Sequence, residues 1–81
     1  MLTSKLIEEE HTIDHVIHID GESVLRITTR KISDPHGPLA EVLLSREFEN
    51  MLQPGTLVRL KRFSSNKTYL SLQVGDMVFD L

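Results

Sequence analysis

Apolar and polar residues alternate in three stretches of this chain. The stretches cover residues 24–32, 57–63 and 68–74, and their apolar sides are formed by Leu25, Ile27 and Thr29, by Val58 and Leu60, and by Leu70 and Leu72. Alternation with a period of two places successive side chains on opposite faces of a β-strand. We therefore expect a half-buried strand in each stretch.

Two further strands are predicted by residue type. Residues 11–19 (HTIDHVIHI) are rich in β-branched side chains, which pack well on a pleated surface, and Asp20-Gly21 then marks a turn. Residues 39–45 (LAEVLLS) form a mostly apolar run. The sequence DPHGP at 34–38 is a strong turn signal, and it separates this run from the preceding strand.

The spacing changes to that of a helix between residues 45 and 54. Apolar side chains recur at i, i+3 and i+4, on Phe48, Met51 and Leu52. Ser45 is a suitable N-cap, and Pro54 with the following glycine ends the segment. One short helix of about two turns is predicted here.

The two ends of the chain differ in character. Residues 1–10 are expected to be a polar lead-in, either a single helical turn capped by Thr3 or Ser4 or a frayed end. Residues 77–81 (MVFDL) are apolar, and they either complete the sheet or contact another subunit. The remaining chain, 11–81, is expected to form a single domain.

The predicted order is three strands, a short helix and two further strands. This is the connectivity of the OB fold, a small, partly open Greek-key barrel. Closure into a barrel also hides strand edges that an open sheet leaves exposed to aggregation. The predicted fold class is therefore all-β, a five-stranded OB-like Greek-key barrel with one short helix between strands 3 and 4.

Composition limits the class of protein. The 81 residues suffice for one domain and are too few for most enzymes that build a cleft from two layers. No apolar run reaches the roughly 18 residues of a membrane span, and the start MLTSKLIEEE is too acidic for a signal peptide. The absence of cysteine favours an intracellular setting, nuclear in a eukaryote and otherwise cytoplasmic.

The net charge of −3 is unevenly distributed. Residues 1–22 hold six acidic residues and one lysine, a charge of −5, whereas residues 23–81 hold eight basic and six acidic residues, a charge of +2. An acidic total argues mildly against nucleic-acid binding, but attraction depends on where the basic side chains lie. The acidic segment either mimics nucleic acid, recruits a basic partner or serves solubility.

Residues 34–72 carry a more specific pattern, which lies in a turn, at a helix end and at a strand start. Its residues are Asp34 and Gly37 in an Asp-x-x-Gly turn, Leu52, Pro54 and Gly55 in "Leu-x-Pro-Gly", and Val58 and Leu60 in "Val-x-Leu". In these motifs the chain resembles OB domains of the replication protein A type. It is especially similar to the OB domain of factors that recruit minichromosome-maintenance helicases in homologous recombination. The likeness covers about half of the chain.

The resemblance implies one of two functions. The first is a module that binds single-stranded nucleic acid, DNA in preference to RNA, in replication, recombination or repair. The alternative is a non-catalytic accessory subunit that contacts a larger protein in such a complex. Resemblance in fold does not choose between these ligands.

The outward side chains of the predicted strands form the candidate nucleic-acid surface. Single-strand binders use cations for phosphates and aromatic rings for base stacking. In OB folds the loop between the last two strands often closes over an oligonucleotide, and Phe63 and Tyr69 flank it here. The candidate binding residues are Arg26, Arg30, Arg59, Lys61, Phe63, Lys67 and Tyr69. The alternative is a solvated basic face with Phe63 filling one end of the barrel.

The apolar tail supplies the candidate protein-binding residues. These are Met77, Val78, Phe79 and Leu81. A partner subunit is a reasonable expectation because a domain of this size buries only about 60% of its unfolded surface and is marginally stable alone. The alternative is that the tail belongs to the core of the barrel.

Histidines and hydroxyls give little support for a metal site or for catalysis. On a strand, His11 and His15 share one face and His18 takes the other, so the three do not converge on one ion. The serines lack an adjacent base in any known catalytic motif, and no Gly-rich phosphate loop precedes a helix. We therefore expect surface histidines in a protein that is not an enzyme, with no catalytic residues, metal ligands or cofactor.

Overall fold

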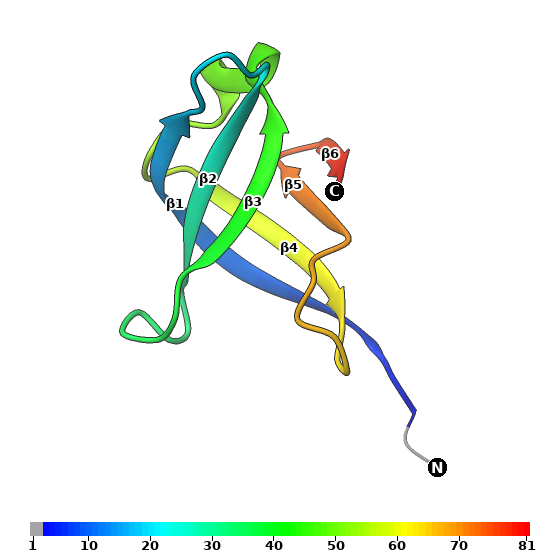
Figure 1. Cartoon of the computed structure of the whole chain (residues 1–81). Helices are drawn as coiled ribbons and strands as arrows, with labels where there is room; N and C mark the ends of the chain where they lie inside the picture. Colours follow the sequence, from blue (N-terminus) through cyan, green and yellow to red (C-terminus); the bar gives the residue numbers. More distant parts are fainter. Residues whose placement is uncertain (1–2) are drawn as a thin grey trace.

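One antiparallel sheet curls into a half-barrel in the computed structural model, which describes residues 3–81 (Figure 1). Its strands are β1 (Leu6–His18), β2 (Val24–Lys31), β3 (Ala40–Ser45), β4 (Leu57–Phe63), β5 (Ser71–Val74) and β6 (Met77–Asp80). A short 3₁₀-helix, η1 (Arg46–Met51), lies between β3 and β4. The strand order across the sheet is β3-β2-β1-β4-β5-β6. The predicted all-β, OB-like class with one short helix after the third strand is confirmed.

Strand β1 begins earlier than the sequence predicted. Residues 6–10 belong to the strand, so the helical turn expected in the first ten residues is wrong. The reason lies in cross-strand pairing, since Glu8 stands opposite Lys61 and Glu10 opposite Arg59 on β4. Opposite charges at directly facing positions stabilise a strand that its own composition does not favour.

A β-bulge interrupts β1 between Ile13 and His15. The extra residue is Asp14, and it changes which side chains face the core. Ile13 is buried before the bulge, and Val16 packs against the core after it. As a result His11 faces inward and His15 faces solvent, although a regular strand would place both on one face.

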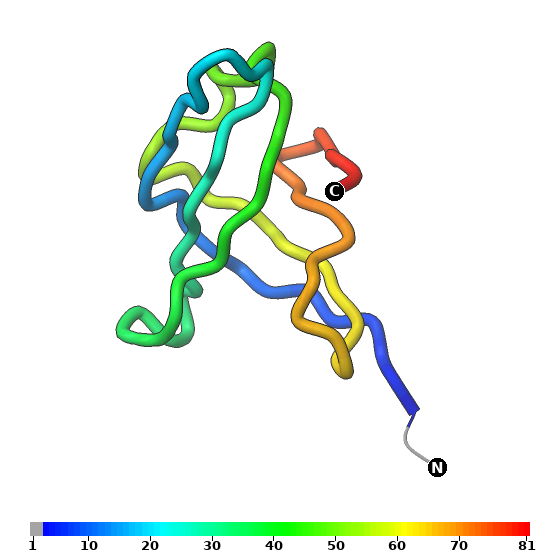
Figure 2. Tube along the Cα trace, viewed as in Figure 1, coloured from blue at the N-terminus to red at the C-terminus, as the bar shows by residue number. Residues whose placement is uncertain are grey.

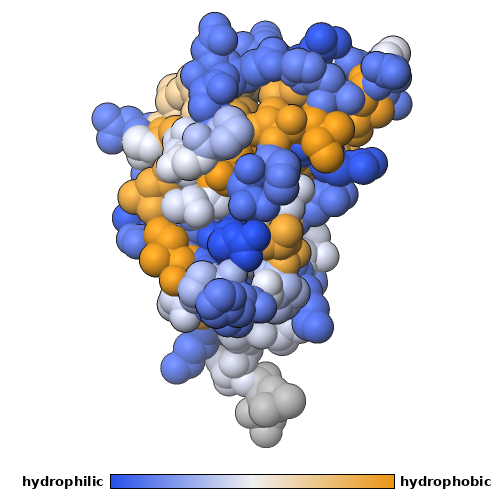
Figure 3. Space-filling model, turned by 90° about the vertical axis from the view of Figure 1, so that its left-hand side faces the viewer, coloured by the Kyte–Doolittle hydropathy of each residue, from blue (hydrophilic) through white to orange (hydrophobic). Residues whose placement is uncertain are grey.

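The core lies inside the curl of the sheet. Its buried apolar side chains are Ile13, Leu25, Ile27, Val42, Leu44, Leu52, Val58, Leu60, Leu72 and Phe79. Every strand contributes to this list, which is why the curl is stable without a second layer. On the face shown in Figure 3, hydrophilic side chains are mixed with hydrophobic patches.

Helix η1 closes one end of the half-barrel. Ser45 is its N-cap, as predicted, and its hydroxyl accepts a hydrogen bond from the backbone N–H of Glu47 (3.4 Å). The helix is of the 3₁₀ type and spans six residues. Two of its three predicted apolar positions contact the core, since Leu52 is fully buried just after the helix and Phe48 packs on Phe79 with ring centroids 4.7 Å apart. The third, Met51, is exposed.

The C-terminal residues form a sixth strand. Gly75 adopts a positive φ of 56°, which allows the tight turn from β5 to β6. Strand β5 starts at Ser71, three residues later than predicted, and pairs with β6. The sheet therefore ends in two edge strands, β3 and β6, which curl toward each other (Figure 2).

Among residues 3–81, no helix has the length and apolar character needed to cross a membrane.

Candidate functional site

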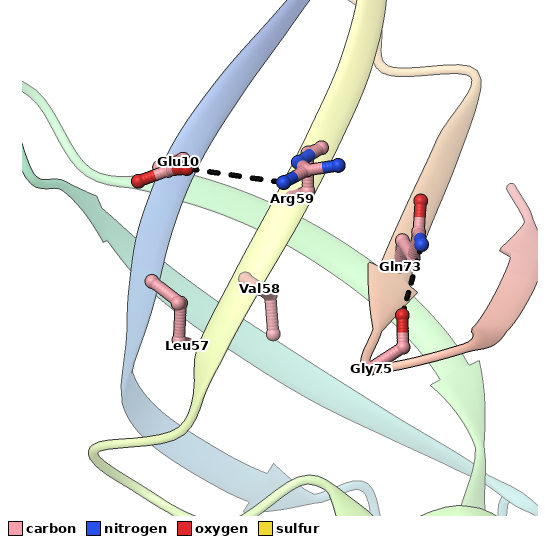
Figure 4. A pocket seen from close by; sticks show the side chains of 6 residues that line it. All are labelled: Glu10, Leu57, Val58, Arg59, Gln73 and Gly75. Carbon is pink, nitrogen blue, oxygen red and sulfur yellow. Dashed lines mark hydrogen bonds and ion pairs between the residues drawn. The ribbon is translucent and has the colours of Figure 1, made fainter.

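The outer face of β1 and β4 carries four charged residues in facing pairs. Arg59 lies 3.5 Å from Glu8 and 3.9 Å from Glu10, and Lys61 lies 3.5 Å from Glu8. Figure 4 shows the carboxylate of Glu10 directed at Arg59, with Gln73 directed at the carbonyl of Gly75. The two basic side chains do share the outward face, as predicted, but acidic neighbours compensate their charge.

A shallow depression of about 200 Å³ lies beside these pairs. It is lined by Glu10, Leu57, Val58, Arg59, Gln73 and Gly75 (Figure 4). Its one cation and its one carboxylate face each other, so the depression offers no net charge to a phosphate.

The basic residues of β2 are also engaged. Arg26 lies 3.3 Å from Glu41 on β3. Arg30 donates to the carbonyl of Pro35 at 2.6 Å and lies 3.5 Å from Asp14. Strand β1 separates β2 from β4, so the structure does not bring these two arginines together with Arg59 and Lys61.

The aromatic residues around the loop between β4 and β5 point in different directions. Phe63 is 43% exposed at the end of β4, opposite Leu6. Tyr69 is half-buried against the core, and its hydroxyl donates to Glu9 Oε2 at 3.2 Å. Lys67 is exposed, and no ion pair involves it within residues 3–81. Only Phe63 and Lys67 of the predicted set are thus free of charged or hydrogen-bonding partners in this part of the chain.

A buried polar cluster lies on the inner side of the sheet, and sequence reasoning missed it. Glu9 is its centre, accepting from Arg62 Nε (2.7 Å) through Oε1 and from His11 Nε2 and Tyr69 through Oε2 (both 3.2 Å). His11 Nδ1 lies 2.9 Å from Thr29 Oγ1. A carboxylate only accepts, so the neutral imidazole carries its proton on Nε2 and accepts from the threonine hydroxyl.

The cluster shifts the pKa of three groups. Burial raises the pKa of Glu9, but the hydrogen bonds from His11 and Arg62 and the charges of Arg62 and Lys31 lower it by more, so the net pKa is below its ordinary value. Burial, together with the nearby charge of Lys31, lowers the pKa of His11 below its ordinary value, although Glu9 acts to raise it. Burial and the Glu9 charge raise the pKa of Tyr69. At neutral pH the cluster therefore holds a carboxylate, a neutral imidazole and a neutral phenol.

The hydrogen-bonded series Thr29, His11, Glu9 has the order of a catalytic triad, in which a hydroxyl nucleophile, a histidine base and a carboxylate follow one another. A working nucleophile must reach its substrate. Here Thr29 is fully buried and His11 is 2% exposed, so no substrate reaches the hydroxyl. This arrangement is structural: it satisfies polar groups that burial would otherwise leave unpaired.

Arg62 connects this cluster to the loop between β4 and β5. Its guanidinium donates to Glu9 and to the carbonyls of Phe63, Ser64 and Asn66 at 3.0 to 3.4 Å. The sequence did contain a signal for this role. In the alternating run of β4, Arg62 falls on the same side as Val58 and Leu60, which marks it as an inward arginine that needs an acidic partner.

The three N-terminal histidines lie in three environments. His11 is buried, which contradicts the expectation of a surface residue, whereas His15 lies at the surface 2.8 Å from Asp14. His18 contacts Glu49 of η1. Within residues 3–81, no group of three His, Cys, Asp or Glu side chains is placed to hold a metal ion.

The apolar tail divides into one core residue and three exposed ones. Phe79 is buried against Phe48, so it belongs to the core rather than to a docking surface. Met77, Val78 and Leu81 are exposed. Val78 and Leu81 border a groove between β3 and the C-terminal segment, which we call the seam. It is lined by residues 39–45 on one side and by residues 67–69 and 78–81 on the other.

Comparison with known proteins identifies no relative. No family model matches this chain, and neither the curated proteins nor the solved structures include a significant match.

Proposed function

We propose that this protein is a non-catalytic interaction module, an accessory subunit whose OB-like sheet binds a protein partner along the seam. The observation that carries this proposal is the exposure of apolar side chains on both sides of one groove. Leu43 on β3 is 53% exposed, Val78 on β6 is 57% exposed and Leu81 is 43% exposed. Apolar side chains gathered at one groove are typical of protein–protein contact sites.

The charge pattern supports a protein partner over a nucleic acid. Each of the four basic strand residues predicted to contact phosphates already lies within 4 Å of a carboxylate. A phosphate would have to displace these carboxylates, and the chain carries a net charge of −3. The lack of cysteine and the resemblance to OB domains of the replication protein A type support an intracellular role in a complex that acts on DNA.

The experiment is affinity capture with the immobilised full chain from an extract of the cells that express it. We expect a specific partner that is lost when Leu43→Glu or Val78→Glu places a charge in the seam. The matched control is Leu57→Glu, since Leu57 is 56% exposed on the outer face of β4. Partner capture that survives the seam variants, or that the control variant abolishes equally, contradicts the proposal.

Single-stranded nucleic acid is the second candidate. It is favoured by the exposed ring of Phe63 and by the charge of Lys67 in the neighbouring loop, which forms no ion pair with residues 3–81. Fluorescence anisotropy with labelled oligo-dT at low salt tests it. If a base stacks on the ring, Phe63→Ala weakens binding by about 1–3 kcal/mol. The salt slope would be shallow, about −0.7 per neutralised phosphate. No anisotropy change at high protein concentration excludes this candidate.

A further inference from the structure

The two edge strands present unpaired backbone groups to the seam. At the end of β3, the backbone N–H of Arg46 donates to the carbonyl of Ser23 (2.9 Å), so these two residues form a hydrogen-bonded pair. Hydrogen-bonded and non-hydrogen-bonded pairs alternate along antiparallel strands, so this one bond determines which residues of β3 bond to β2. Val42 and Leu44 bond to β2, so Glu41 and Leu43 direct their N–H and C=O groups away from the sheet.

The same reasoning applies to β6. Leu81 donates to the carbonyl of Leu70 (3.0 Å), which places Phe79 and Met77 in bonded pairs with β5. Val78 and Asp80 therefore direct their backbone groups toward the free edge. Both sides of the seam thus offer backbone donors and acceptors with no partner within residues 3–81, an arrangement that templates the addition of another strand.

The core is incompletely covered along this seam. Seven of its ten apolar residues are at most 2% exposed. The other three are Val42, Leu44 and Phe79, at 7%, 6% and 8%, and all three belong to the edge strands. Two hollows of about 550 and 390 Å³ lie there, and both are bordered by Leu43. Together the two hollows follow β3 from residue 39 to residue 45, and Leu43 lies between them.

Charges mark the two ends of the groove. Lys67 borders the hollow beside the start of β3, and Asp80 borders the hollow beside its end. Neither side chain takes part in an ion pair within residues 3–81. Glu41 also borders the groove, but Arg26 compensates its charge. An occupant that complements the groove is therefore acidic near Lys67 and basic near Asp80.

We propose that the seam binds an extended segment of a partner protein as a seventh strand, hydrogen-bonded to β3 on one side and to β6 on the other. This inference rests on the proposed function. The occupant is a strand rather than a helix, because a helix has already used its backbone groups and cannot bond to either edge. Its inward side chains are apolar and cover Val42, Leu44 and Phe79. Its ends carry the charges described above.

The test begins with a phage-displayed library of random decapeptides selected on the immobilised full chain. We expect peptides in which apolar residues alternate, with an acidic residue toward one end and a basic residue toward the other. Amide hydrogen exchange with a selected synthetic peptide should slow at Leu43 and Val78. Protection confined to the loop around Phe63, or a library without binders, overturns the proposal.

N-methylation of the selected peptide tests hydrogen bonding on both sides. In a strand between two edges, successive N–H groups point to opposite neighbours. Methylation at either of two consecutive central residues should therefore weaken binding at least about tenfold, since each removes a backbone hydrogen bond. A loss only at alternate residues means addition to a single edge, and no loss at either means contact through side chains alone. Both results contradict a bridging strand.

Charge variants test the orientation of the bound segment. The double variant Lys67→Glu, Asp80→Lys should select peptides with the reversed order of charges, whereas Lys5→Glu, on an exposed lysine away from the seam, should leave the selection unchanged. If the double variant selects the same peptides as the unmodified chain, the charges proposed for the ends of the bound segment are wrong. A sedimentation coefficient that rises with protein concentration and falls on adding peptide identifies the occupant as a second copy, and also contradicts the proposal.

The outcomes separate this inference from the proposed function. If partner capture requires Leu43 and Val78 but a selected peptide does not compete with it, the protein is an interaction module and strand insertion is wrong. The absence of both a partner and a peptide rejects both.

Discussion

Glu9 and Glu10 are sequence neighbours with opposite roles. Glu9 faces inward and is hydrogen-bonded to an arginine, a histidine and a tyrosine, whereas Glu10 is exposed on the outer face. The alternation of the strand alone separates them. A buried carboxylate depends on all its partners, because each lost bond leaves a desolvated charge.

Glu9→Gln should therefore lower the free energy of unfolding by about 1.5–3 kcal/mol, the contribution of hydrogen bonds to a charged group. The amide keeps the shape of the carboxylate but loses the charge that Arg62 bonds to. Urea unfolding measures the change. Glu10→Gln is the control, with an expected midpoint near that of the unmodified chain. Equal behaviour of the two variants would mean that the buried cluster adds nothing to stability.

The same cluster predicts loss of stability in acid. His11 has a folded-state pKa below its ordinary value of 6.5, so the unfolded chain takes up its proton first, and stability falls as the pH drops through this range. Glu9, whose folded-state pKa is below 4.5, adds a second loss at lower pH. Tyr69, with a raised pKa, loses its contribution as the pH rises above 10.

Urea titrations between pH 8 and pH 3 measure this dependence. His11→Gln should remove the decline between about pH 7 and pH 5, while His15→Gln, at an exposed position, should retain it. A decline in that range that persists in the His11 variant would assign it to another group.

At the scale of elements, the sequence predicts most of the strands and the position of the helix. The alternation in β2 and β4 is clear because most of their inward residues are apolar, the exceptions being Thr29 and Arg62. Ser45 and Pro54 bracket η1 by local backbone chemistry. The start of β1 could not be predicted in this way. Its three consecutive glutamates are stabilised by Arg59, Lys61 and Arg62, which are about 50 residues away in the chain.

The candidate site was predicted less well for a related reason. Alternation correctly places Arg59 and Lys61 on the outer face, but nothing local shows that β1 will set Glu8 and Glu10 beside them. The bulge at Asp14 likewise has no marker in the sequence, so the inward position of His11 was missed. Register and bulges depend on the partner strand, and a single sequence does not reveal them.

The junction after η1 yields a prediction for an element. Leu52→Ala should destabilise the fold by about 2–5 kcal/mol, since Leu52 is fully buried and its removal leaves a cavity. Its neighbour Met51 is exposed, and Met51→Ala should change stability little. Thermal unfolding followed by circular dichroism compares the two variants. A small effect for Leu52 would show that η1 does not anchor this end of the sheet.

At the scale of the whole molecule, the sheet is an incomplete barrel. Its curl brings β3 and β6 to opposite sides of the seam without pairing them (Figure 1). Natural proteins usually protect such edges, because an exposed edge recruits other strands. Here the edges carry exposed Leu43 and Val78, and the core is least covered beside them. The open seam is the feature that links this fold to a partner.

Amide hydrogen exchange of the free chain at low concentration tests this central claim most directly. If both edges are open, the amides of Leu43, Val78 and Asp80 exchange rapidly, while those of Val42, Leu44 and Phe79 in the same strands are protected by β2 and β5. This residue-by-residue alternation is the predicted result. Strong protection of Leu43 and Val78 in the dilute monomer would mean that the barrel is closed, and would contradict the account.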